Sequence, residues 1–178
     1  MRSLLYKYCA IGLIVMLTII SLQSSAQQLF HGKVIEPSNE ETEALATRFS
    51  ERTVFQLDIE KLSQFVQNNG DFSAFTLQIG DAYTWDIELV KNELRSPDYY
   101  AIQMTNDGPV LVPPGPCITY RGNLQSDPEA VVRLGIDENL LDGYVWQKDG
   151  FVFIEPGYKY GLNTPGSCFS TLTLKFWA

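Results

Sequence analysis

Apolar and polar residues alternate along most of the chain, and this period of two predicts β-strands. In residues 53–59, Phe55, Leu57 and Ile59 occupy one face, while polar residues occupy the other. Similar alternation predicts further strands at residues 75–79, 84–89, 100–104, 117–123, 130–136, 140–147, 151–155 and 171–177. Many short strands with polar outer faces predict a mainly β domain, either an antiparallel β-sandwich or a partly closed barrel.

One or two short helices are predicted near the N-terminal end of this domain. Ser38 and Glu41 have the spacing of a capping box, which predicts a helix over residues 39–50. Leu62, Phe65 and Val66 predict a helical turn at residues 60–67. The chain is then divided into a leader (1–26), an extended lead-in with its helix (27–52), a β domain (53–160) and a C-terminal segment with a last strand (161–178).

The first residues have the pattern of an export signal. Arg2 and Lys7 form a positive start, residues 11–20 form a short apolar run, and small residues precede a predicted cut before Gln27. The apolar run is about half the length that a membrane-spanning helix needs. The sequence therefore predicts a secreted or periplasmic protein with no membrane attachment after cleavage.

The charge and the cysteines narrow the choice of partners and cross-links. The formal net charge of −8 argues against nucleic acid and anionic membranes as partners. Cys117 and Cys168 are left after the leader. An exported protein meets an oxidising compartment in which a disulfide persists, but two cysteines bond only if their Cα atoms lie close together. A Cys117–Cys168 bridge and two free thiols both stay open.

Catalytic residues are sparse in this sequence. His31 is the only histidine, whereas a zinc protease needs several imidazoles that converge on one metal. Acidic residues occur in two clusters. The first cluster contains Asp81, Asp86 and Glu88, and the second contains Asp137, Glu138 and Asp142. The first is expected to face solvent, and the second has the spacing of no calcium loop. The sequence therefore predicts neither enzymatic activity nor a metal or other cofactor in this chain.

Aromatic residues support two interpretations. Trp85 and Tyr100 alternate with polar neighbours, which predicts that both lie in the core. Others are candidates for a flat platform that would bind glycans or surface proteins: Tyr99, Tyr144, Trp146 and Trp177. Exposed, coplanar rings would favour that interpretation.

Several short motifs occur in a fixed order between residues 54 and 160: Trp85-Asp86-Ile87-Glu88-Leu89, Lys91-Asn92-Glu93-Leu94, Pro97-Asp98-Tyr99, Tyr120-Arg121-Gly122-Asn123, Val131-Val132-Arg133-Leu134, Leu141-Asp142-Gly143-Tyr144 and Phe153-Ile154-Glu155-Pro156. Their order resembles the prodomain of bacterial reprolysin-type (adamalysin, ADAM-like) zinc metalloproteases. Gly122 and Gly143 are expected where φ is positive or two backbones approach closely. Pro156 is expected to end strand pairing, and Glu155 to pair locally.

The resemblance implies a function without catalysis. Such prodomains assist the folding of a protease and keep it latent, and some place a cysteine on the catalytic zinc. Cys168 is the candidate for that role, acting on a protease encoded separately or lost by truncation. Two alternatives stay open: an exported β-sandwich binding module for glycans or surface proteins, and a truncated gene fragment of a metalloprotease precursor.

Overall fold

The computed structural model describes residues 27–49 and 51–162 and the backbone of residues 167–174. The chain is mainly β, as predicted. Its elements are β1 (Gln28–Val34), α2 (Asn39–Ala46), β2 (Arg52–Gln56), α3 (Ile59–Asn68), β3 (Phe72–Ile79), β4 (Tyr83–Lys91), β5 (Ala101–Thr105), β6 (Gly108–Val112), β7 (Thr119–Leu124), β8 (Asp127–Asp137), β9 (Leu140–Gln147), β10 (Gly150–Pro156), the 3-10 helix η1 (Gly157–Tyr160) and β11 (Ser167–Leu174).

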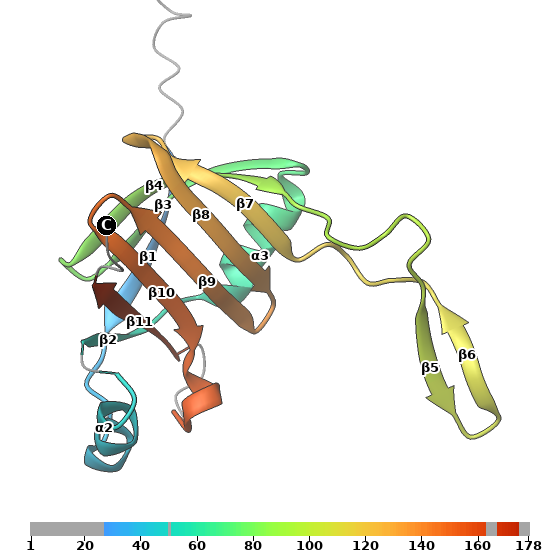
Figure 1. Cartoon of the computed structure of the whole chain (residues 1–178), viewed down its shortest axis with the longest axis horizontal. Helices are drawn as coiled ribbons and strands as arrows, with labels where there is room; N and C mark the ends of the chain where they lie inside the picture. The colour runs from blue at the N-terminus through green and yellow to red at the C-terminus, as the bar shows by residue number, and fades with distance from the viewer. Residues whose placement is uncertain (1–26, 50, 163–166, 175–178) are drawn as a thin grey trace, which may run out of the picture.

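The barrel alternative of the prediction is confirmed, and the sandwich alternative is not observed. Eight strands form one strongly curled sheet in the order β2-β1-β3-β4-β7-β8-β9-β10 (Figure 1). The backbone of β11 pairs with both β10 and β2 and closes the ring. Closure gives each barrel strand two neighbours, which removes the open edges that promote aggregation.

The expectation of purely antiparallel pairing is wrong at one place. β1 runs parallel to β3, with Gln28 opposite Phe75 and Gly32 opposite Ile79. Residues 27–52 were predicted as a lead-in with a helix outside the β domain, but Gln28–Val34 form this barrel strand. Parallel neighbours need a long crossover connection, and α2, β2 and α3 supply it between β1 and β3.

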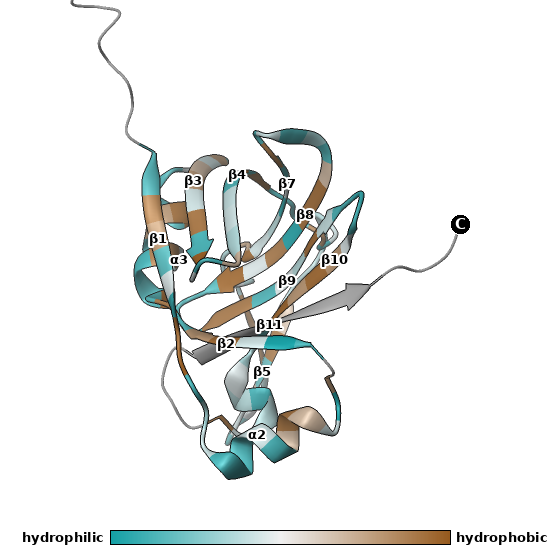
Figure 2. Cartoon of the chain, turned by 90° about the vertical axis from the view of Figure 1, so that its left-hand side faces the viewer, coloured by the Kyte–Doolittle hydropathy of each residue, from teal (hydrophilic) through white to brown (hydrophobic). Residues whose placement is uncertain are grey.

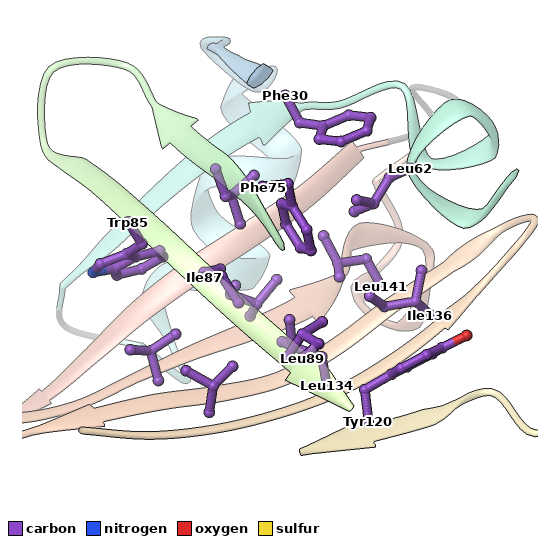
Figure 3. Close-up of a cluster of buried hydrophobic side chains, with 14 of the residues drawn as sticks. Phe30, Leu62, Phe75, Trp85, Ile87, Leu89, Tyr120, Leu134, Ile136 and Leu141 are labelled. Carbon is purple, nitrogen blue, oxygen red and sulfur yellow. The ribbon is translucent and has the colours of Figure 1, made fainter. Parts of the chain in front are cut away.

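Apolar and polar residues alternate along the barrel strands (Figure 2), and the apolar side chains form one buried cluster. Leu77, Ile87 and Leu134 are among the fully or almost fully buried side chains, and Figure 3 shows part of the cluster that they form. Helix α3 contributes Leu62 and Val66 to the same core and packs against β3 and β8. Burial of this core in one closed sheet is the main source of stability.

Helix α2 begins as the sequence predicts. The Glu41 backbone N–H donates to Ser38 Oγ at 3.3 Å, and the Ser38 N–H donates to the Glu41 carboxylate at 2.8 Å. The helix ends at Ala46, earlier than predicted, and its one buried residue is Leu45. Leu45 packs with Val54 and Leu162 in a small second core beside η1.

Two glycines lie where strands approach closely, as expected. A Cβ atom added to Gly122 would lie 1.8 Å from the Glu88 carbonyl oxygen in β4. A Cβ atom added to Gly143 would lie 2.0 Å from the Arg133 carbonyl oxygen, and φ of Gly143 is 139°. Both positions therefore require glycine for the geometry of the barrel wall.

Candidate functional site

A long arm leaves the barrel between β4 and β7 and returns to it (Figure 1). The strands β5 and β6 form a two-stranded hairpin at its end, and they pair only with each other. β4 and β7 pair directly, from Ile87 opposite Leu124 to Lys91 opposite Tyr120. The arm therefore adds no strand to the barrel.

One face of the hairpin is entirely apolar. The register places Ile102 opposite Leu111 and Met104 opposite Pro109, so these four side chains share a face. We call them the hairpin apolar face. The exposed fractions are 58% for Ile102, 74% for Met104 and 67% for Leu111. Single exposed apolar residues are common on protein surfaces, whereas these four side chains lie together on one face.

The opposite face of the hairpin is mixed. It carries the pairs Ala101–Val112, Gln103–Val110 and Thr105–Gly108. The turn between the strands is held by Thr105, whose hydroxyl donates to the Gly108 carbonyl at 2.8 Å and accepts from the Asp107 N–H. An isolated hairpin is marginally stable in water, so a partner surface would add stability to this one.

Polar contacts hold the neck of the arm, where its two sides meet. The Asn92 N–H donates to the Thr119 carbonyl at 2.9 Å, and the Thr119 hydroxyl donates to the Asn92 carbonyl at 2.6 Å. Arg95 binds the Glu93 carboxylate through two nitrogens and donates to the Gly115 carbonyl across the neck at 2.7 Å. These hydrogen bonds from Arg95 lower the pKa of Glu93 to about 2.

The cysteine expectations fall partly outside the described side chains. Cys117 lies at the neck as a free thiol, with Sγ 3.4 Å from the Thr119 carbonyl oxygen. The bridge with Cys168 stays a prediction, because only the backbone of Cys168 is described. The backbone of Cys168 pairs with Phe55 and Pro156, and its side chain, with the proposed zinc contact, lies outside the described part.

The aromatic expectations meet a mixed outcome. Trp85 is buried, as predicted, and stacks on Tyr83 with ring centroids 4.9 Å apart. Tyr100 was predicted to lie in the core, but it is 61% exposed because it precedes β5 in the arm. Tyr99 is exposed beside Arg95.

Tyr144 and Trp146 do not form a flat platform. They are half-buried on the outer surface of β9 and pack on Phe151 of β10 at interplanar angles of 62° and 48°. Trp177, the other proposed member, lies outside the described residues. The rings at β9 and β10 are therefore tilted against each other, which does not favour the stacking of a sugar on a coplanar surface.

The remaining motif residues serve the barrel wall. Tyr120 is buried, and its pKa is raised, chiefly by burial. Pro156 ends β10, as expected, and η1 follows it. Glu155 pairs locally, also as expected: its carboxylate accepts from the Tyr160 hydroxyl at 2.5 Å, and this bond raises the pKa of Tyr160.

The other candidate groups do not gather at one place. His31 is exposed on β1. Asp86 accepts from the Thr76 hydroxyl at 2.6 Å, and Asp142 forms an ion pair with Lys159 at 3.0 Å. In the described part of the chain, no three His, Cys, Asp or Glu side chains lie close enough together to hold a metal ion. No helix there has the length and apolar character to cross a membrane.

The sequence interpretation missed β6 and the position of the hairpin. Residues 100–104 were predicted as a strand, but nothing in their alternation tells a barrel strand from a projecting one. Two signals were present. Asn106-Asp107-Gly108 lies between two apolar runs, as in a tight hairpin, and prolines flank the segment at Pro97 and at 113–116.

No family model matches the chain, and no curated protein matches it significantly.

Proposed function

We propose that the chain is an exported, non-catalytic, propeptide-like domain that binds a zinc metalloprotease and keeps it latent or assists its folding. The hairpin apolar face is the main contact surface, and the barrel is the scaffold that presents it. The leader is removed before Gln27. The observation that carries the proposal is a row of exposed apolar side chains on the arm. The arm contributes no strand to the barrel, because β4 and β7 pair directly.

The energetics favour a protein partner for this arm. Full burial of an isoleucine, leucine or methionine side chain contributes roughly 1.5–3 kcal/mol. Ile102, Met104 and Leu111 are each more than half exposed, so most of that contribution is still available on binding. In typical interfaces a few residues contribute most of the binding energy.

The amino-acid composition of the arm also indicates which kind of partner surface it would contact. Asp107, in the hairpin turn, is the only charged residue from Tyr99 to Cys117. The partner surface is therefore expected to be apolar rather than basic. The outer edges of β5 and β6 carry backbone groups that pair with no strand, so they suit a groove that accepts an extended segment. The choice of a zinc metalloprotease as this partner comes from the resemblance to reprolysin-type prodomains.

The first test compares the two faces of the hairpin. The double variant Ile102→Ser, Leu111→Ser removes the anchors, and the control variant Gln103→Ser, Val110→Ser changes the opposite face. We expect the first variant to bind and inhibit a reprolysin-type protease about 100-fold more weakly, because losing two anchors costs about 3 kcal/mol or more. The control is expected to change inhibition less than tenfold. Equal inhibition by both variants would contradict the role of the apolar face.

A second variant separates binding from folding. A short glycine–serine turn replaces residues 94–116, while the Asn92–Thr119 contacts are kept. This variant is expected to keep its cooperative unfolding transition and lose its effect on protease activity and refolding yield. Size-exclusion chromatography with light scattering is the accompanying measurement. If the original chain is a dimer and the Ile102→Ser, Leu111→Ser variant is a monomer, the arm binds a second copy and the protease proposal fails.

A further inference from the structure

Gln27 has an unusual environment at the beginning of β1. Its side-chain nitrogen Nε2 is buried and has no hydrogen-bond partner. Among the described buried side-chain groups, only the Tyr120 hydroxyl shares this condition. Gln27 also lines a cavity of about 460 Å³ with Gln28, Phe65, Asn69, Phe72 and Gln125. A buried donor without an acceptor loses its hydrogen bonds to water and gains none in the protein, so this amide nitrogen opposes folding.

We propose that Gln27 is a modification site, where the mature N-terminus cyclises to pyroglutamate. The inference rests on the leader cleavage included in the proposed function. Cleavage before Gln27 frees its α-amino group. The α-nitrogen attacks the side-chain carbonyl carbon Cδ, and an N–Cδ bond forms. The Cδ–Nε2 bond breaks, the proton of the amine moves to the leaving nitrogen, and ammonia departs. The step needs no oxidant, reductant or cofactor.

The surroundings of Gln27 favour the cyclised product. Cyclisation removes Nε2, the group that has no acceptor. It also removes the positive charge of the free α-ammonium group. No carboxylate lines the cavity, so an α-ammonium group placed there would have no ion-pair partner. The lactam product keeps one C=O and one N–H, so it has one donor nitrogen fewer to satisfy than the open side chain and free amine together.

The position of β1 holds this ring at the barrel wall. Gln28 pairs with Phe75 of β3, one residue after the proposed ring. An N-terminus attached in this way is also protected from aminopeptidases, which need a free α-amine. The modified residue would therefore lie directly before the first barrel strand and not on a free terminus.

The test expresses the full chain with its leader in a host that exports it. Intact mass and the mass of the N-terminal peptide are then measured. We expect the mass of residues 27–178 less one ammonia, and no free α-amine. The variant Gln27→Ala is expected to keep the full calculated mass and a free amine. The matched control Gln28→Ala is expected to cyclise like the original chain. Cyclised protein is expected to melt at a higher temperature than freshly cleaved, uncyclised protein.

Two outcomes would overturn the inference. A mature chain that begins at Gln27 and keeps its free amine after prolonged incubation at neutral pH refutes the cyclisation alone. A mature chain that begins at another residue refutes it together with the predicted cleavage site. The protease assays with hairpin variants do not depend on either result, so the failure of one proposal is distinguishable from the failure of the other.

Discussion

Replacement of Gly122 by alanine tests whether the barrel wall depends on the contact between β4 and β7. Gly122 pairs with Leu89, and an added Cβ atom would lie 1.8 Å from the Glu88 carbonyl oxygen and 2.8 Å from the carbonyl carbon. Cβ atoms essentially never approach another heavy atom within 3.0 Å. The two backbones would therefore have to separate by more than an ångström.

The magnitude follows from what must move. Overpacking that only shifts side chains costs about 1–3 kcal/mol. Here the obstacle is backbone, and separation also weakens ladder hydrogen bonds worth about 0.5–1.5 kcal/mol each. We therefore expect Gly122→Ala to lower the free energy of unfolding by about 3 kcal/mol or more. That loss is a large share of the roughly 5–15 kcal/mol typical of a domain.

Urea denaturation followed by tryptophan fluorescence measures this loss, because Trp85 is buried in β4 itself. Gly135→Ala in the neighbouring strand β8 is the matched control. Its added Cβ atom would lie 2.8 Å from Asp142 Oδ1, the end of a side chain that can rotate away. The control is expected to cost less than about 1 kcal/mol. A loss below about 1 kcal/mol for Gly122→Ala as well would refute the close approach of β4 and β7.

Three further predictions concern single side chains. Tyr120→Phe removes a buried hydroxyl without a partner, so denaturation should show unchanged or higher stability, by up to about 1 kcal/mol; a clear loss would indicate that the hydroxyl is bound. Ser38→Ala should destabilise the domain by about 0.5–2 kcal/mol through the lost helix cap, and an unchanged unfolding midpoint would contradict this. The Glu93–Arg95 pair should stabilise the neck fully above the ordinary carboxyl pKa near 4.5, and this stabilisation should be lost as the pH falls through the lowered pKa of Glu93, about 2. Amide hydrogen exchange at the neck measures this, and Glu93→Gln should abolish the pH dependence.

Much of the barrel could be predicted from the sequence because burial follows the period of two. Phe75, Leu77 and Ile79 alternate with polar residues, and all three are buried. The capping box at Ser38 fixes the start of α2 locally, so it also could be predicted. The close approaches at Gly122 and Gly143 were expected from the resemblance and from the small size of glycine.

Pairing across long distances in the chain could not be predicted in the same way. The seven residues of β1 carry no clear alternation, and their place beside β3 depends on the crossover through α2, β2 and α3. Gln27 gave no signal of a site beyond the cleavage pattern before it. That its buried Nε2 has no hydrogen-bond partner can be recognised only from the structure, in the cavity beside α3 and β3.

The arm shows most clearly why periodicity alone does not locate a functional surface. Ile102 and Met104 alternate with polar residues as Leu77 and Ile79 do, yet the first pair faces solvent and the second lies in the core. The two pairs differ because barrel strands flank β3, whereas β5 and β6 pair only with each other. β4 and β7 pair directly, and the barrel closes without β5 or β6. A hairpin outside the barrel loses conformational entropy when it becomes ordered, and it exposes apolar surface to water. Packing within the barrel compensates for neither of these costs. Burial against another protein would offset both, and this is the physical basis for treating the arm as the functional part of the chain.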